Sequence, residues 1–206
     1  DTLTETFTAT SIDGTTETIT ITITGTNDVA VITGDVTGGV TEDNSATLTT
    51  SGSLVSNDTD TGESGFQTQT NTAGTYGDFS IDANGNWNYN ADNSQTAIQS
   101  LGAGDTLTEI FTATSIDGTT ETITITITGT NDVAVITGDV TGAVTEDNSA
   151  TLTTSGALVA NDTDTGESGF QTQTNTAGTY GDFSIDANGN WNYDADNSQT
   201  SIQSLA

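Results

Sequence analysis

The sequence lacks six amino acids: Lys, Arg, His, Cys, Met and Pro are absent from all 206 residues. Without His, Cys or Lys, the chain has no base for a catalytic triad, no thiolate, no Schiff-base amine and no tetrahedral zinc site. Carboxylate-pair chemistry is the only catalytic route left, and the sequence offers no cleft-forming insertion for it. These absences indicate a protein that is not an enzyme.

The missing cations leave 29 Asp and Glu residues without an internal counter-charge, for a formal net charge of −29. The phosphates of nucleic acids and anionic membrane surfaces repel such a polyanion, so we expect neither nucleic-acid binding nor direct membrane contact. Self-repulsion also opposes compact folding unless salt or a bound cation offsets it. Ca²⁺ fits best, because it accepts carboxylate, carbonyl and amide oxygens in flexible geometry, whereas Mg²⁺ demands tight octahedra and keeps its waters.

The absence of cysteine excludes disulfides, and bound metal takes over their role in a small extracellular domain. No apolar run approaches the roughly 18 residues of a membrane span, and no signal peptide is visible, so we expect export to be encoded elsewhere in a longer chain. Disorder is the alternative for an acidic chain with 31% hydrophobic residues. Regular alternation of apolar and polar residues argues against disorder when calcium is present.

The chain contains two nearly identical copies of one sequence. Residues 1–102 match residues 105–206 at an offset of 104, with seven differences. A repeat of this length exceeds solenoid periods of roughly 20–50 residues and suits one autonomous small domain. Identical neighbouring domains provide reach and multivalency rather than catalysis. We therefore expect a tandem array, with residues 1–26 as the C-terminal hairpin of a preceding module, 27–130 as a complete module and 131–206 as a following module that lacks its last hairpin.

Strict alternation in residues 18–24 and 122–128 predicts strands that bury isoleucine on one face, with Ile19, Ile21 and Ile23 pointing inward. Asp13-Gly14 is typical of the hairpin turn that precedes the first of them. Further strands are expected at residues 29–36, 46–55, 65–70, 75–81 and 86–90, with one helical turn within 92–101 and with Trp87 and Trp191 in the core. Seven short strands per repeat predict an all-β fold of immunoglobulin-like sandwiches.

Two complementary sheet edges remain open in this scheme, one on the hairpin at residues 1–26 and one on residues 131–206. We expect the hairpin of one chain to complete the truncated module of another chain, in addition to contacts between neighbouring identical modules.

Four motifs occur in the same order in both copies: Gly25-Thr26-Asn27-Asp28, Thr41-Glu42-Asp43, the segment 54–60 and the segment 82–89. Together they resemble the VCBS-type, cadherin-like repeats of giant bacterial RTX adhesins, most closely the extender regions of ice-binding members. The resemblance covers the whole chain and implies a calcium-rigidified rod that holds a distal ligand-binding domain away from the cell. The chain departs from the family where Val29 and Val133 replace the proline that often follows Asn-Asp.

Calcium ligands are expected where the strand order gathers acidic residues, at the two poles of each sandwich and in the linkers. Asp58 and Asp60 stand at positions i and i+2 of one loop, a spacing that lets both reach one ion. At the junction of two modules, we expect exit-pole, linker and entry-pole carboxylates to converge. The predicted ligands are Asp28, Glu42, Asp43, Asp58, Asp60, Glu63, Asp82, Asp105, Glu109, Asp132, Glu146, Asp147, Asp162, Asp164, Glu167 and Asp186.

Alternatives remain open at several of these positions. The loop at residues 58–63 is also compatible with a solvated acidic surface, and Asp82 and Asp186 suit ordinary Asx turns equally well. Glu5 and Glu109 share the inward parity of their apolar neighbours, and a bare buried carboxylate is costly. Either calcium neutralises them, or a bulge turns them outward.

The function that these features favour is a calcium-rigidified spacer of a secreted, surface-attached bacterial adhesin. The alternative is a directly adhesive module that binds ice or carbohydrate through the outward threonine rows, such as residues 16–24, or through the two tryptophans. The rows are also explained by the β-propensity of threonine.

Overall fold

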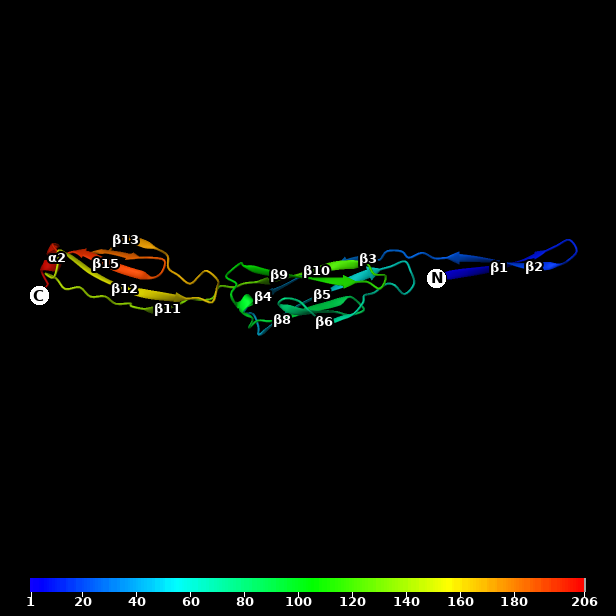
Figure 1. The fold of residues 1–206 in the computed structure, drawn as a ribbon, viewed down its shortest axis with the longest axis horizontal. Coiled ribbons are helices and arrows are strands. Elements are labelled where there is room, and N and C mark those ends of the chain that lie inside the picture. The colour runs from blue at the N-terminus through cyan, green and yellow to red at the C-terminus, as the bar shows by residue number, and fades with distance from the viewer. Residues whose placement is uncertain (206) are drawn as a thin grey trace. The chain divides into compact units, whose positions relative to one another are not determined.

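The structure is a computed structural model that describes residues 1–205, nearly all of them in strands and the turns that join them (Figure 1). The hairpin and the elements of the first copy are β1 Thr2–Thr10, β2 Thr16–Thr24, β3 Val31–Gly34, β4 Thr37–Thr41, β5 Thr47–Asn57, β6 Gln69–Ala73, β7 Gly77–Ile81, β8 Asn86–Asp92, α1 Thr96–Gln99, β9 Thr106–Thr114 and β10 Thr120–Thr128. The elements that follow are β11 Val135–Gly138, β12 Thr151–Asn161, β13 Gln173–Ala177, β14 Asp182–Ile185, β15 Asn190–Asp196 and α2 Thr200–Gln203.

The chain forms two compact units. The first comprises Asp1–Gly38, Thr49–Asn90 and Glu109–Ile125, and the second comprises Gly39–Leu48, Ala91–Thr108 and Thr126–Ala206. Several strands, among them β4 and β5, continue from one unit into the other. Among the described residues, no helix has the length and apolar character needed to cross a membrane.

Two sheets make up residues 31–128, one with the strand order β3-β5-β8-β7-β6 and one with the order β4-β10-β9. This arrangement confirms the predicted all-β sandwich. It contains eight strands rather than the predicted seven. The strand expected at residues 29–36 is present as the shorter β3, and β4, at residues 37–41, was not predicted. Gly34 has φ +125°, a conformation that favours glycine, and the chain turns there. β3 therefore pairs with β5, whereas β4 joins the sheet of β10.

The prediction of a strand at residues 65–70 was also wrong in its bounds. β6 begins only at Gln69, and Phe66 makes an isolated bridge to Ser115. Asn71 has φ +48°, and the pairing of β6 with β7 shifts register between Gln69 and Thr72. The predicted helical turn is present as α1, a single turn whose buried side chain is Ile98.

The core of the first unit is a stack of aromatic rings that joins the two sheets. Phe79 of β7 lies 4.9 Å from Phe111 of β9, centroid to centroid, with nearly parallel rings, and 6.2 Å from Trp87 of β8. The indole N–H of Trp87 donates to the backbone oxygen of Asp35 at 2.8 Å. Trp87 and Trp191 are both buried, as predicted, so neither is available to stack on a sugar.

The same hairpin sequence has two environments. In β10, Ile123, Ile125 and Ile127 are fully buried, as the alternation predicts. In β2, the corresponding Ile19, Ile21 and Ile23 are 46–53% exposed, although β1 and β2 pair in a continuous register from Thr2↔Thr24 to Thr10↔Thr16. The β-hairpin therefore forms from local sequence, and burial requires a second sheet.

The second copy repeats the larger sheet, with the strand order β11-β12-β15-β14-β13. Trp191 again lies opposite a glycine, Gly156 of β12. Residues 141–145, which correspond to β4, form no strand. The partner of β4 in the first copy is β10, and no strand of the described residues takes that place in the second copy.

Candidate metal centre

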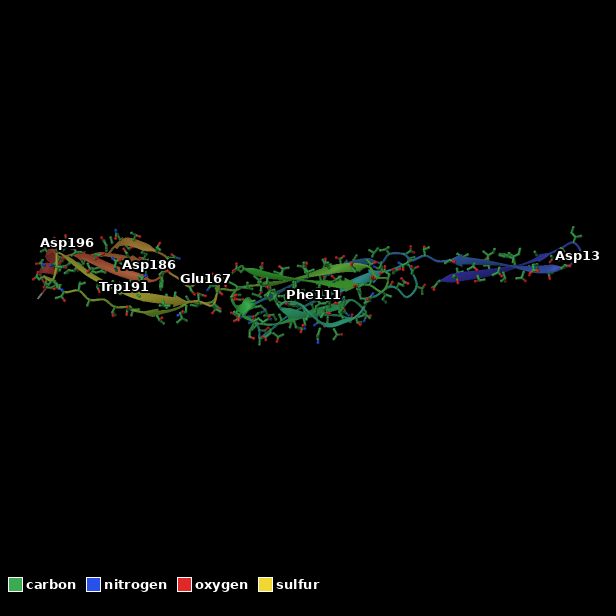
Figure 2. All side chains as sticks on the ribbon, in the orientation of Figure 1. Asp13, Phe111, Glu167, Asp186, Trp191 and Asp196 are labelled. Carbon is green, nitrogen blue, oxygen red and sulfur yellow. The ribbon has the colours of Figure 1, made fainter. Side chains whose placement is uncertain are left out.

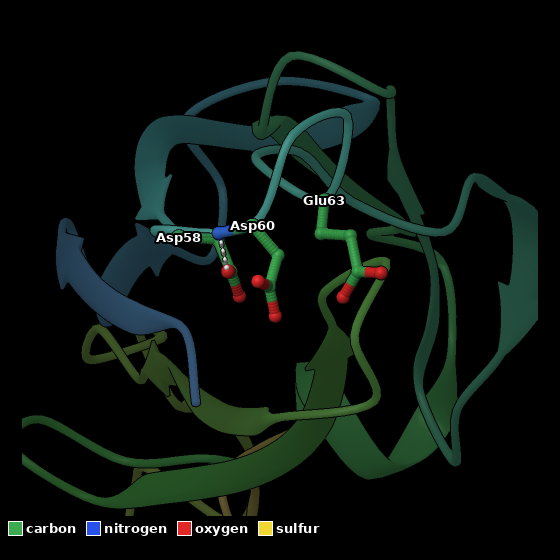
Figure 3. A group of neighbouring side chains, drawn as sticks. All are labelled: Asp58, Asp60 and Glu63. Carbon is green, nitrogen blue, oxygen red and sulfur yellow. Dashed lines mark hydrogen bonds between the residues drawn. The ribbon is translucent and has the colours of Figure 1, made fainter. Parts of the chain in front are cut away.

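The loop that follows β5 brings three predicted ligands together. One carboxylate oxygen each from Asp58, Asp60 and Glu63 lies within 4.8 Å of the others, and Figure 3 shows the three side chains directed toward one space. The amide of Asp60 donates to Asp58 Oδ1 at 2.8 Å, and the amide of Asp28 donates to Asp60 Oδ2 at 2.7 Å. The loop backbone and the preceding linker thus orient the carboxylates.

Two oxygens of this group are buried and lack a partner. Within the described residues, Asp58 Oδ2 and Glu63 Oε2 have no hydrogen bond. A buried carboxylate oxygen without a donor loses its hydrogen bonds to water and forms no replacement, which costs free energy. Since the chain has no Lys, Arg or His, a cation that pairs with such oxygens would have to come from solution. The donor set, carboxylates only, fits Ca²⁺.

A second acidic group lies within the second compact unit. Glu42, which follows β4, and Asp164, in the loop that follows β12, are 1% and 2% exposed. Thr130 donates its amide to Glu42 Oε1 at 3.2 Å, and Asp132 donates its amide to Asp164 Oδ2 at 2.9 Å. The two carboxylates therefore hold the short segment between β10 and β11.

The second oxygens of these two carboxylates, Glu42 Oε2 and Asp164 Oδ1, are buried without a partner among residues 1–205. Burial raises the pKa of Glu42 above its ordinary value, and the charges of Asp43, Asp164 and Asp132 raise it further against the opposing hydrogen bond from Thr130. An anion surrounded by anions in a dehydrated position is what a divalent cation stabilises. Among the described residues, only the carboxylates of Asp58, Asp60 and Glu63 form a group of three within 4.8 Å. The carboxylates of this second group are oxygen donors of the kind that Ca²⁺ accepts.

Glu167 and Asp105 extend this second group. A Cβ atom placed on Gly102 would lie 2.8 Å from Glu167 Oε1 and 3.7 Å from Asp105 Oδ2, so both carboxylates lie beside that glycine. Thr165, in the same loop as Glu167, donates its amide to the oxygen of Ser100 at 3.0 Å. Figure 2 labels Glu167 in this loop.

The remaining predicted ligands have other surroundings. Asp82 accepts the amides of Asn84 and Asn86, each at 2.9 Å, which is the geometry of an Asx turn and lowers its pKa through those hydrogen bonds, first of all those of Asn86. Asp186 repeats this turn between β14 and β15 (Figure 2). Neither belongs to the carboxylate group at residues 58–63.

Asp43 and Asp147, the residues next to Glu42 and Glu146, both adopt positive φ, 59° and 61°. Gln99 donates to Asp43 Oδ1 at 3.1 Å, and Gln203 donates to Asp147 Oδ1 at 3.2 Å.

Asp28 is exposed, and its amide rather than its carboxylate reaches Asp60. Asp162 accepts the amide of Asp164 at 2.9 Å, as Asp58 does in the first copy. Glu146 lines an open apolar hollow.

Glu109 is buried, but the chain itself satisfies its carboxylate. The hydroxyl of Tyr89 donates to Oε2 at 2.5 Å, and the amides of Thr75 and Tyr76 donate to Oε1, the latter at 2.9 Å. Its burial therefore does not depend on a cation. The alternative of a bulge is wrong for Glu5, since β1 pairs with β2 without a break.

Sequence reasoning missed the donors in both places, Tyr89 for Glu109 and the Thr130 amide for Glu42. Tyr89 was detectable, because it shares the inward parity of Trp87 on the same strand, β8. The Thr130 amide carries no sequence signal, since every residue except proline supplies one.

The two facing sheets, with acidic loops after β5 and β12, define the protein as a cadherin-like β-sandwich module. The chain belongs to the bacterial cadherin-like domain family, whose model matches residues 27–129. The predicted resemblance to cadherin-like repeats is thereby confirmed. A search of the curated proteins finds no match.

The comparison with solved structures finds PcdhgB3 EC1-4, among others, with 12% identity, TM-score 0.46 and coverage of 94% of this chain and 55% of that one. A Ca²⁺-stabilized adhesin with which an Antarctic bacterium reaches out and binds ice has 19% identity, TM-score 0.27 and coverage of 96% and 49%. The human Desmocollin-1 ectodomain has 11% identity, TM-score 0.22 and coverage of 90% and 57%. The chain spans about half the length of these proteins, and the family assignment rests on the family model.

Proposed function

We propose that this chain, an adhesion-related structural module by its family and fold, is a calcium-rigidified spacer of a cell-surface adhesin. In this proposal it is an extender whose neighbouring identical modules project a distal ligand-binding domain from the cell. The observation that carries the proposal is the pair Glu42 and Asp164, two buried carboxylates with unpartnered oxygens in a chain without a single basic side chain.

The proposed rigidification of the linker follows from the hydrogen bonds that these two carboxylates accept from it. Glu42 accepts the amide of Thr130, and Asp164 accepts the amide of Asp132, so successive linker amides are bound from two different loops. Without a cation, the repulsion between the two carboxylates favours separation of those loops. Bound Ca²⁺ would supply the positive charge that makes the same pair attractive, with Asp132, Asp105 and Glu167 as further oxygen donors.

The loop at residues 58–63 repeats the arrangement with Asp28 in place of Asp132. Each repeat therefore brings the same acidic loop to the segment that precedes it. A stiff array results when each such segment binds calcium, and a flexible array results when calcium is removed.

Small-angle X-ray scattering tests the proposal directly. The maximum dimension of the chain in calcium should exceed that in chelator, since the linker segment is fixed only in calcium. Glu42→Gln should reduce the difference, whereas Glu146→Gln, the same substitution at the equivalent position of the second copy, should leave it unchanged. An identical maximum dimension of the wild-type chain in calcium and in chelator contradicts the spacer function.

A further inference from the structure

The turn between β7 and β8 contains a chemically labile pair, Asn84-Gly85. Glycine follows asparagine at only two places in the sequence, here and at Asn188-Gly189 in the turn between β14 and β15. The side-chain amide of asparagine is among the least stable groups of a protein. Glycine has no Cβ atom, so its backbone nitrogen can approach that amide without steric hindrance. Each copy of the repeat therefore carries one labile pair.

The side chain of Asn84 is accessible to water. It is exposed, and within residues 1–205 it takes part in no hydrogen bond. Asn188 is exposed in the same way. Neither burial nor a hydrogen-bond partner of the side chain therefore protects these two amides.

The fold requires glycine at position 85. Gly85 has φ +88°, and a Cβ atom placed on it would lie 2.2 Å from the backbone oxygen of Leu54 and 2.8 Å from the ring of Phe66. Gly189 has φ +86° and equivalent close neighbours. A larger residue would slow the attack on the asparagine side chain, but it would be strained at either position. The labile pair is thus a consequence of the turn itself.

Hydrogen bonds hold the backbone of this turn closed. The Gly85 amide donates to the backbone oxygen of Asp82 at 3.0 Å. Asp82 Oδ1 accepts the amides of Asn84 and Asn86, each at 2.9 Å, and Asp186 makes the same contacts in the second copy. The Gly85 nitrogen must give up its hydrogen bond and its proton before it can attack the side chain. The closed turn therefore opposes the reaction, and local opening permits it.

We propose that Asn84 and Asn188 are sites of spontaneous deamidation, and that the turns capped by Asp82 and Asp186 restrict the reaction to the moments when a turn opens. The deprotonated nitrogen of Gly85 attacks Cγ of Asn84, and the new C–N bond closes a succinimide ring. Nδ2 leaves as ammonia together with the proton that the glycine nitrogen has lost. Water then opens the ring at either carbonyl group, which yields aspartate or isoaspartate, and no other co-reactant is needed.

Isoaspartate prevents the turn from closing again, because it adds a carbon atom to the backbone between Asp82 and Gly85. The Leu54 amide donates to the oxygen of Gly85 at 2.9 Å, and the Phe66 amide donates to the oxygen of Ala83 at 3.1 Å. A lengthened backbone does not keep both of these contacts together with the bond from Gly85 to Asp82. Each reaction therefore converts a brief opening into a lasting change. The proposal does not depend on bound calcium or on the spacer function.

Tandem mass spectrometry of the 206-residue chain, incubated with calcium in a mildly alkaline buffer, tests the proposal. A glutamate-specific protease separates the two turns into fragments 64–109 and 168–206. Each fragment is searched for the mass increase that accompanies replacement of NH₂ by OH. We expect Asn84 and Asn188 to react ahead of the other asparagines, and more slowly in native protein than in protein held in denaturant, where the turns are open.

Asp82→Ala removes the acceptor that caps the first turn and should raise the rate at Asn84 about fivefold relative to Asn188 in the same molecule. Asp186→Ala should change the ratio in the opposite direction. Asp82→Asn keeps Oδ1 as an acceptor for the two amides, so its ratio should stay close to that of the wild type. Circular dichroism checks that each variant is folded, and the variant of the other copy takes the place of one that is not.

Absence of deamidation at both Asn84 and Asn188, in native and in denatured protein, overturns the proposal. Equal rates in the two conditions also overturn it, because the turns would then offer no protection. A ratio of the two rates that neither Asp82→Ala nor Asp186→Ala changes has the same meaning, since the caps would then not control the opening.

Discussion

At the scale of single residues, the absence of basic side chains changes what a buried carboxylate does. Glu109 is satisfied by a tyrosine hydroxyl and two amides, whereas Glu42 and Asp164 each keep one buried oxygen without a donor. The first arrangement is complete without a ligand. The second leaves an oxygen that a cation could satisfy, and we propose that this difference separates structural from metal-binding carboxylates in this chain.

The hydroxyl of Tyr89 is expected to contribute to the stability of the complete sandwich. Tyr89→Phe removes a donor from the buried Glu109 and should lower the free energy of unfolding by about 1–3 kcal/mol, as measured by denaturant unfolding. Tyr193→Phe, the same substitution in the second copy, should cost much less in dilute, monomeric protein. Equal losses in the two variants would show that Glu109 is not held as described.

Asp117 gives the chain an acid-sensitive turn. Hydrogen bonds from Ser115, Thr119 and the Ala30 amide hold the pKa of Asp117 well below its usual range. Because the folded-state pKa lies below the unfolded one, the ionised carboxylate stabilises the fold above the unfolded pKa of about 3.9, and this stabilisation is lost as the pH falls through the folded value.

Asp117→Asn should therefore lower the melting temperature at neutral pH, and the difference from the wild type should shrink as the solution is acidified. Thermal unfolding followed by circular dichroism across the acid range measures this. Asp13→Asn removes the same charge from the equivalent turn of β1–β2 (Figure 2) and should leave the melting of the sandwich unchanged. A difference at Asp117 that stays constant with pH argues against the turn as its source.

At the scale of elements, the two-residue period was enough to predict strands but not the sheets that they join. The isoleucine alternation located β2 and β10 correctly, and parity placed Trp87 in the core. The end of β3 at Gly34 and the start of a separate β4 at Thr37 depend on the φ of Gly34, which the pattern does not encode. The loss of β4 in the second copy depends on a distant partner strand, which no local window contains.

The sequence likewise predicted the grouping of some carboxylates but not the surroundings of others. The spacing of Asp58 and Asp60 predicted one loop, and the structure brings these two residues and Glu63 together. Asp82 lies in an Asx turn whose local hydrogen bonds occupy its oxygens, and Asp43 accepts a hydrogen bond from the distant Gln99. Sequence spacing does not distinguish either case from ligation. The assignment of each residue to a metal stays a prediction.

β1 and β9 have nearly the same sequence but differ in burial, so they allow the contribution of burial to the free energy of unfolding to be measured. Phe111→Ala in β9 should lower the free energy of unfolding of the sandwich by about 3–5 kcal/mol, because it empties a packed aromatic stack. Phe7→Ala is the same substitution on a strand whose phenylalanine is 53% exposed, and it should have little effect in dilute protein. Denaturant unfolding of both variants measures the difference, and similar losses would contradict the burial pattern.

At the scale of the whole molecule, the repeat turns one local arrangement into a periodic one. A net charge of −29 makes every compact state of the chain costly unless cations are taken up. Placing the same acidic loop beside each linker concentrates that cost at the linkers, and under the proposed function a cation bound there would also restrict their motion. The proposal thus connects the charge composition and the placement of the loops with a spacer function.

Calcium binding by the buried carboxylates is the central claim, and a titration of thermal unfolding tests it most directly. The melting temperature is followed from chelator upward in Ca²⁺, with Mg²⁺ and Na⁺ at matched ionic strength and with Glu42→Gln beside Glu146→Gln. A calcium-specific rise is expected, worth about 2.7 kcal/mol per site at a hundredfold excess over the dissociation constant, and smaller for Glu42→Gln only. An equal response to all three salts would contradict the account, because it would mean that the acids are a screened surface without metal sites.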